Sequence, residues 1–261
     1  MRMKGWWVAV VGACVACAKE EAAPAVAPAP SVTAAPISTA AAPSAASPPN
    51  ATERPVSGHF VGGVGGQVAT RIDPSCDEVI FAVAEGTAKA AGEDLQKNDA
   101  LLLLAPDATV DIFSTGTALI AAVKHACPAG PRPAFAKHVV RASAAPELIW
   151  AGGAMHAHLD AEKDVSPGAY FGRLEGTAPV VEHMHKGSWE VLFAIEASGT
   201  FTLDGNPQRV GRYSVVYVPP DAKHSWAPDP GSKLVAFQIY TPPGPEQRFK
   251  GLAAEAGAPK P

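Results

Sequence analysis

The sequence repeats itself, and this repeat limits the fold more than any other feature does. Three short patterns recur in one order at offsets of 112 or 114 residues. They are Glu-Val-Ile-Phe-Ala-Val at 78–83 and Glu-Val-Leu-Phe-Ala-Ile at 190–195, Pro-Asp-Ala at 106–108 and 220–222, and Pro-x-Gly-Pro-x-x-x-Phe at 128–135 and 242–249. Such agreement predicts two copies of one structural unit.

The runs between these patterns have the length and composition of β-strands. Residues 200–203 are β-branched or aromatic at several positions and precede Asp204-Gly205, a pair favoured in tight hairpins. Both faces of 191–195 are apolar, as in a strand covered on both sides. No segment has a convincing long amphipathic pattern. We therefore predict an all-β protein with barrels at 55–135 and 136–249, followed by a flexible tail at 250–261.

Four residues of the second half have the chemistry and spacing of metal ligands. His183 and His185 alternate along an extended segment, so both imidazoles can share one face. Glu190 begins the apolar run that follows, and His224 follows a Pro-Pro-Asp turn. Three histidines and one carboxylate suit a first-row transition metal and leave positions for water or substrate.

These two segments resemble the paired motifs of the cupin superfamily, H-x-H-x(3,4)-E-x6-G and P-x-G-x-x-H. The ligands match, whereas their surroundings depart from the pattern in three places. Gly199 comes two positions late, Asp221 replaces a glycine, and Pro228 stands where many members have asparagine. None of these departures removes a ligand.

The resemblance implies two double-stranded β-helix, jelly-roll-like barrels and one divalent metal, which could be Mn, Fe, Ni, Cu or Zn. It offers oxygenases, decarboxylases and sugar isomerases as precedents without choosing among them. A non-catalytic protein that binds a small ligand, or a structural surface protein, is the alternative.

The first half lacks the same ligands. At the repeat offsets, His183, His185 and His224 correspond to Arg71, Asp73 and Val110, while Glu78 keeps the identity of Glu190. We predict a degenerate, metal-free first barrel.

A second H-x-H pattern, His156 and His158 with Glu162 and Gly168, falls one residue short of the motif and leads into a turn. We assign these histidines to an early strand of the second barrel. Trp226 lies two residues after His224 and can wall the pocket beside the metal or pack in the core.

The N-terminus reads as an export signal. A basic start precedes an apolar run at 5–16 that is too short to cross a bilayer, and small residues precede Cys14 and Cys17. We expect a lipoprotein-type signal at 1–17 with lipidation of Cys17, Cys14 being the alternative, or plain signal cleavage without lipid. Residues 18–54 are rich in Ala and Pro and predict a disordered tether to the bacterial cell envelope.

The charge and the remaining cysteines fit this compartment. The formal charge of −4 becomes −6 without Arg2 and Lys4, which argues against nucleic acid as a partner. In an oxidising compartment Cys76 and Cys127 can form a disulfide, or each can be a separately buried thiol. The sequence leaves a homo-oligomer open. It also contains no nucleophile elbow, P-loop or Rossmann fingerprint.

Overall fold

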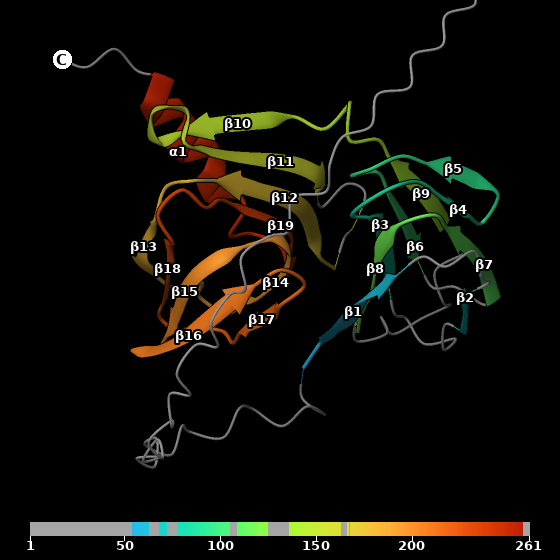
Figure 1. Cartoon of the computed structure of the whole chain (residues 1–261), viewed down its shortest axis with the longest axis horizontal. Coiled ribbons are helices and arrows are strands. Elements are labelled where there is room, and N and C mark those ends of the chain that lie inside the picture. The colour runs from blue at the N-terminus through green and yellow to red at the C-terminus, as the bar shows by residue number, and fades with distance from the viewer. Residues whose placement is uncertain are drawn as a thin grey trace, which may run out of the picture. The chain divides into compact units, whose positions relative to one another are not determined.

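The computed structural model describes residues 54–62, 68–71, 78–104, 109–124, 136–162, 166 and 168–257. Cys14, Cys17, Cys76 and Cys127 lie outside these ranges, as do the signal and tether segments before residue 54 and the last four residues. Nearly all of the described elements are strands (Figure 1).

The strands of the described residues form four sheets, two in each half of the chain. The first half has the orders β1-β8-β3-β6-β9 and β2-β7-β4-β5, and the second has β10-β11-β12-β19-β14-β17 and β13-β18-β15-β16. The first-half strands are β1 (Val56–Gly62), β2 (Val68–Arg71), β3 (Glu78–Val83), β4 (Ala88–Ala90), β5 (Glu93–Leu95), β6 (Ala100–Leu104), β7 (Thr109–Ser114), β8 (Thr117–Val123) and β9 (Ala136–Val140).

The described residues of the second half form ten strands and two short helices. They are β10 (Glu147–Trp150), η2 (Ala151–Gly153), β11 (Met155–Ala161), β12 (Tyr170–Gly176), β13 (Val180–His183), β14 (Trp189–Glu196), β15 (Ser198–Leu203), β16 (Asn206–Gly211), β17 (Val215–Val218), β18 (His224–Pro228), β19 (Leu234–Thr241) and α1 (Gln247–Gly257).

The two halves have the same strand pairing, which confirms two barrels of one kind. β3 lies between β8 and β6, and β14 lies between β19 and β17. The smaller sheets likewise match strand for strand. The two strands that carry the sequence repeat therefore occupy equivalent positions, and the all-β, double-stranded β-helix fold is confirmed.

The register of the repeat, however, differs from the sequence alignment by one residue. Asn98 N–H donates to Val83 O at 2.7 Å, and Tyr213 N–H donates to Ala194 O at the same distance, both from residues with positive φ. Val83 thus matches Ala194. Counting back from this match, Val79, and not Glu78, occupies the position in the first barrel that Glu190 occupies in the second. A one-residue shift turns every side chain to the other face, so Glu78 does not correspond to the carboxylate of the second half.

Strand alternation explains how the core is divided. In β3, Val79, Phe81 and Val83 face the first-barrel interior, whereas Ile80 and Ala82 join a cluster shared by both barrels.

In β14, Val191 and Phe193 belong to the shared cluster, and Leu192 and Ala194 belong to the second-barrel interior. The large sheets of the two barrels therefore pack face to face through largely apolar surfaces. This packing accounts for the doubly apolar run that the sequence shows at 191–195.

The predicted hairpin and the early strand of the second barrel are both present. Asp204 and Gly205 have φ of 46° and 76° and connect β15 to β16, as a two-residue turn with positive φ at both positions requires. His156 and His158 lie on β11, next to β10 and β12 in the large second sheet.

Two boundaries differ from the sequence prediction. β9, assigned to the second barrel, pairs with β6 in the first barrel's sheet. The expected flexible tail is instead helical as far as Gly257, because Phe249 is buried and Lys250 Nζ lies 2.7 Å from Glu162 Oε1. An isolated helix of this length is marginal, so tertiary contacts decide its formation. Among the described helices, none combines the length and apolar character needed to span a bilayer.

A buried ion pair joins the second barrel to the segment between the barrels. Arg173 on β12 makes two hydrogen bonds to Asp160 on β11, at 2.8 and 3.0 Å, and reaches Ala142 O at 3.3 Å. The side chains are 5% and 0% exposed. The pair is therefore almost completely withdrawn from water.

We predict that Arg173→Met lowers the free energy of unfolding by about 3–5 kcal/mol, because it leaves the Asp160 carboxylate buried without its partner. Adding Asp160→Leu should restore much of this loss. Urea denaturation of the two variants and the wild type measures the difference. Equal stabilities of Arg173→Met and the wild type would show that Asp160 gains another partner or water.

Candidate metal centre

Three neighbouring segments of the second barrel carry the four predicted ligands. His183 ends β13, His185 follows in the turn, Glu190 lies at the start of β14, and His224 begins β18. β13 and β18 pair antiparallel with His183 opposite His224. Asp221 N–H also donates to His185 O at 3.0 Å, which ties together the turns that precede β14 and β18. All four side chains therefore meet inside one barrel.

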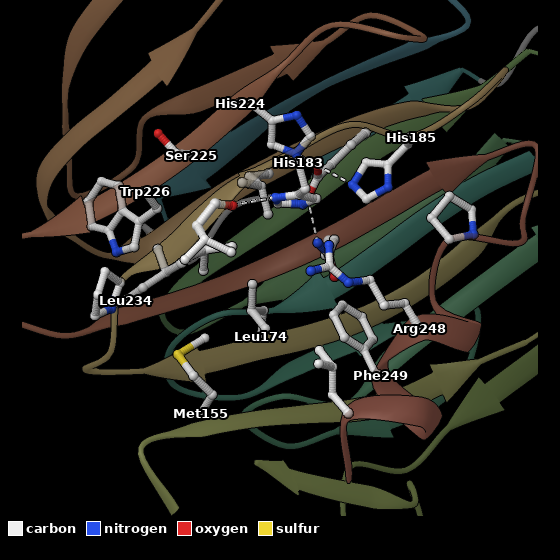
Figure 2. Close-up of a pocket in the computed structure, with 18 of the residues that line it drawn as sticks. Met155, Leu174, His183, His185, His224, Ser225, Trp226, Leu234, Arg248 and Phe249 are labelled. Carbon is white, nitrogen blue, oxygen red and sulfur yellow. Dashed lines mark hydrogen bonds and ion pairs between the residues drawn. The ribbon is translucent and has the colours of Figure 1, made fainter. Parts of the chain in front are cut away.

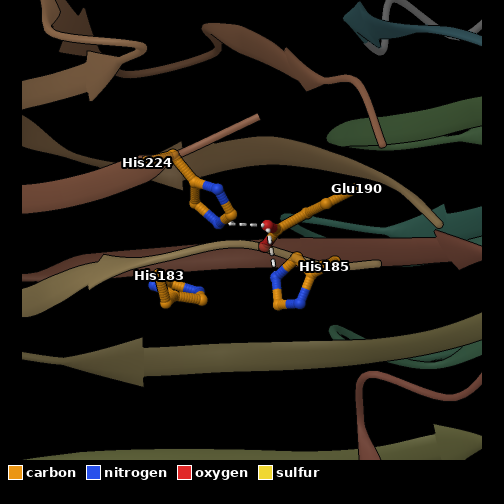
Figure 3. Close-up of side chains that lie close together, drawn as sticks. All are labelled: His183, His185, Glu190 and His224. Atoms are coloured by element: carbon orange, nitrogen blue, oxygen red, sulfur yellow. Dashed lines mark hydrogen bonds and ion pairs between the residues drawn. The ribbon is translucent and has the colours of Figure 1, made fainter. Parts of the chain in front are cut away.

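The ligand atoms converge on one point, as Figure 3 shows. One atom from each of the four residues lies within 4.8 Å of the others. Glu190 Oε2 lies 3.1 Å from His185 Nε2 and 2.9 Å from His224 Nε2. His185, Glu190 and His224 are buried, and His183 is partly exposed. Within the described part of the chain, no second group of three or more such residues comes as close.

Backbone carbonyls orient two of the imidazoles. His183 Nδ1 lies 2.9 Å from Val181 O, and His224 Nδ1 lies 3.0 Å from Ala222 O. A neutral imidazole that donates from Nδ1 carries its lone pair on Nε2. Both rings are thus fixed with Nε2 as the free ligand atom, which is the usual outer-shell arrangement of metal-binding histidines.

Two observations fit a transition metal at this point. Ligand bonds of about 2.0–2.2 Å place neighbouring donors of an octahedral ion about 3 Å apart, close to the two carboxylate–imidazole separations above. In addition, His224 Nε2 is buried and makes no aligned hydrogen bond to any described residue, although Glu190 Oε2 is close. A buried imidazole nitrogen without an aligned hydrogen bond fits the role of a metal ligand.

Burial and mutual contact set the protonation of the cluster. Burial, with help from the nearby His224, lowers the pKa of His183 to about 4, so its imidazole is neutral at pH 7. Burial alone would raise the pKa of Glu190, but its contacts with His185 and His224 outweigh burial and hold the pKa well below its usual range. The carboxylate is therefore ionised and able to act as a ligand.

Gln238 and Tyr240 on β19 hold Glu190, and the sequence analysis did not identify them. Gln238 Nε2 donates to Glu190 Oε1 at 2.5 Å and to Tyr240 Oη at 2.8 Å, and Tyr240 Oη donates to Glu190 Oε1 at 3.3 Å. Burial raises the pKa of Tyr240 well above its usual value, so its hydroxyl stays protonated. The available signal was a glutamine inside the otherwise apolar run 234–240.

The cluster lies at one end of a pocket of about 260 Å³ in the second barrel (Figure 2). Its walls are mainly apolar and include Met155, Leu174, Leu192, Phe201, Trp226 and Leu234. Trp226 thus lines the pocket and is also packed in the barrel interior. Side chains of α1 complete the wall.

Other groups near the ligands in sequence lie elsewhere in space. Tyr213 donates to Glu85 of the first barrel at 3.0 Å, and Lys223 is exposed at 3.8 Å from Glu182. His156 Nδ1 lies 2.8 Å from Glu147 Oε1 and its Nε2 lies 3.0 Å from Gly153 O, so both nitrogens have partners. In the first half, Arg71 and Val110 lie on the paired strands β2 and β7. Asp73 is outside the described residues.

The departures from the motif are tolerated for local reasons. Asp221 has a φ of 63°, a left-handed conformation that glycine adopts freely and that aspartate tolerates better than most residues. At Gly199, a Cβ atom would come within 2.4 Å of Trp226 Cη2 and 2.5 Å of Ala227 O. Gly199 is therefore required by the close approach of β18.

Comparisons with known proteins show the fold. No protein-family model matches the chain, and no curated protein matches it in sequence. A Pseudomonas aeruginosa protein described as glyoxylate-induced is similar in structure, with a TM-score of 0.56, 11% identity, and coverage of 70% of this chain and 73% of its own. Protein YlbA from E. coli gives a TM-score of 0.55 at 12% identity, with 72% and 77% covered. The chain has the all-β jelly-roll fold of cupins.

We predict that Gln238→Leu weakens metal binding by about 10- to 100-fold, because Glu190 Oε1 loses its shortest hydrogen bond. Competition between the protein and a chelator for Co²⁺ measures the affinity. Gln208→Leu, the same substitution at an exposed position of β16, is the control and should leave the affinity unchanged. An unchanged affinity in Gln238→Leu would show that Glu190 keeps its position without the amide.

Proposed function

We propose that the second barrel binds one divalent first-row transition metal through His183, His185, Glu190 and His224, and that the protein is a metal-dependent enzyme acting on a small molecule. The observation that carries this proposal is the convergence of four ligand atoms at one end of an apolar pocket. When bound, such a metal polarises a coordinated oxygen or supports oxidation, depending on its identity. Oxygenase, decarboxylase and isomerase chemistry are the classes that the cupin resemblance offers.

Residues around the cluster orient the metal ligands and shape the pocket for a small molecule. The carbonyls of Val181 and Ala222 set the tautomers of two imidazoles, and Gln238 and Tyr240 fix the carboxylate of Glu190. The apolar pocket walls favour a ligand that is itself largely apolar. A small molecule held there is oriented by the shape of the pocket while one of its polar atoms reaches the cluster.

Binding without turnover is the second candidate function, and one observation favours it. Among the described residues that line the pocket, the titratable groups outside the four ligands are Tyr240 and Arg248. Tyr240 is bonded to Glu190 and has a raised pKa. Neither side chain is a ready proton acceptor, so catalysis has to use a ligand residue, water or the substrate itself.

The test begins with the metal. We expect one equivalent of metal per chain in the wild type and in Arg71→Ala, and none in the double variant His185→Ala/His224→Ala, because the remaining pair cannot retain the ion. Elemental analysis of the purified proteins measures the content, and circular dichroism checks that each variant is folded. Metal retained by the folded double variant, or two equivalents in the wild type, contradicts the proposed site.

The same proteins then decide between the two functions. Wild type and the double variant are incubated with small carboxylates, sugars and phenols, and products are followed by mass spectrometry. Product that forms only with the wild type supports an enzyme. A metal-dependent spectral change without product supports a binding protein. If there is neither product nor a spectral change, both functions are contradicted.

We also propose that the protein is exported and lipid-anchored in the bacterial cell envelope through Cys17, with Cys14 as the alternative. The short apolar leader, the small residues before each cysteine and the Ala- and Pro-rich segment that follows support this proposal. Two acyl signals suffice for stable anchoring.

Globomycin, which blocks lipoprotein signal cleavage, should cause the precursor to accumulate in an expressing bacterium, with Cys17→Ala as the comparison. Normal processing in the presence of the inhibitor, with a fully soluble mature protein, contradicts lipid anchoring.

A further inference from the structure

The helix α1 closes one side of the pocket and is held firmly against the barrel. The ring of Phe249 stacks on Trp150 with a centroid separation of 5.5 Å and an interplanar angle of 19°. Lys250 Nζ and Gln247 Nε2 contact Glu162 Oε1 at 2.7 and 3.1 Å. These contacts on both sides of residue 248 fix the direction in which its side chain leaves the helix.

Arg248 contributes a positive charge to this otherwise apolar wall. Of the described residues that line the pocket, it is the single lysine or arginine. Lys250 on the same helix has a carboxylate partner, whereas the Arg248 guanidinium makes no ion pair or hydrogen bond with another described side chain. Figure 2 shows the guanidinium extending from α1 towards the histidine cluster. The charge is thus left available to a ligand.

Arg248 also stands where the pocket meets a second opening. An open cavity of about 470 Å³ is lined by His185, Lys186, Pro245 and Arg248, and three of these residues also line the main pocket. His185, one of the four candidate ligands, lines both cavities together with Arg248. The guanidinium is therefore near the cluster as well as near the entrance.

We propose that Arg248 binds the carboxylate of the molecule that occupies the pocket, so that the ligand is a small carboxylic acid whose remaining part is apolar. This inference rests on the proposed function, in which the pocket takes up a small molecule at the metal. A guanidinium matches a carboxylate with two parallel hydrogen bonds, which fix the orientation of the bound acid. Arg248 is then a specificity-determining residue.

Other ligand classes fit the wall less well. A sugar would place several hydroxyl groups against Met155, Leu174 and Leu234, where they would lose hydrogen bonds to water without replacement. A phosphate monoester carries close to two negative charges at neutral pH, and the wall offers one unpaired guanidinium. A monocarboxylate matches one guanidinium and leaves the rest of the molecule to the apolar walls.

The experiment compares two probes of equal shape, benzoate and the neutral benzamide, by calorimetry on protein loaded with one equivalent of Co²⁺. We expect the wild type to bind benzoate about tenfold or more tightly than benzamide. Arg248→Gln should abolish this preference and Arg248→Lys should restore part of it. Lys89→Gln removes the same charge at an exposed position of the first barrel and should retain the preference.

Metal content separates the two proposals. If Co²⁺ binds and the ratio of the two affinities is the same in the wild type and Arg248→Gln, the carboxylate assignment is overturned while the metal site stands. If no Co²⁺ binds but benzoate is still preferred through Arg248, the metal proposal fails and the carboxylate assignment stands. Equal affinities of the wild type for the two probes, or no binding of either, also overturn the assignment.

Discussion

The burial of one carboxylate governs the arrangement of the second barrel. Glu190 is 3% exposed, and a charge so far from water is tolerated only when its oxygens have partners. One oxygen is held by Gln238 and Tyr240, and the other faces His185 and His224. These partners come from β19, β18 and the turn before β14. The contacts of one buried carboxylate therefore link three segments of the barrel.

Packing between the barrels gives this cluster a rigid base. β14 buries Val191 and Phe193 against the first barrel and Leu192 in its own interior, so neither face of the strand is free to move. Close-packed interiors resist displacement, and a ligand fixed on such a strand keeps its position. The first barrel therefore contributes to the site through the apolar face that it presents to β14.

Much of this could be predicted from the sequence because the controlling signals are local. Alternation places His183 and His185 on one face, and the Asp204–Gly205 hairpin follows from the backbone preferences of its residues. The contribution of Gln238 could not be predicted in the same way, since it depends on which strand pairs with β14. The helix α1 was missed for a related reason, because its stability comes from Trp150 and Glu162, roughly 85 to 100 residues earlier in the chain.

The register of the repeat shows that identical residues in a sequence alignment need not lie on the same face of equivalent strands. The sequence alignment makes Glu78 the equivalent of Glu190, yet the matching hydrogen bonds to Val83 O and Ala194 O make Val79 the equivalent of Glu190. Valine faces the first-barrel interior, together with Phe81, in the place where the second barrel carries its carboxylate. An apolar residue at this position needs no histidines to compensate a buried charge. Among the described residues, the second barrel is then the half in which this position carries a carboxylate and belongs to a cluster of metal-ligand type.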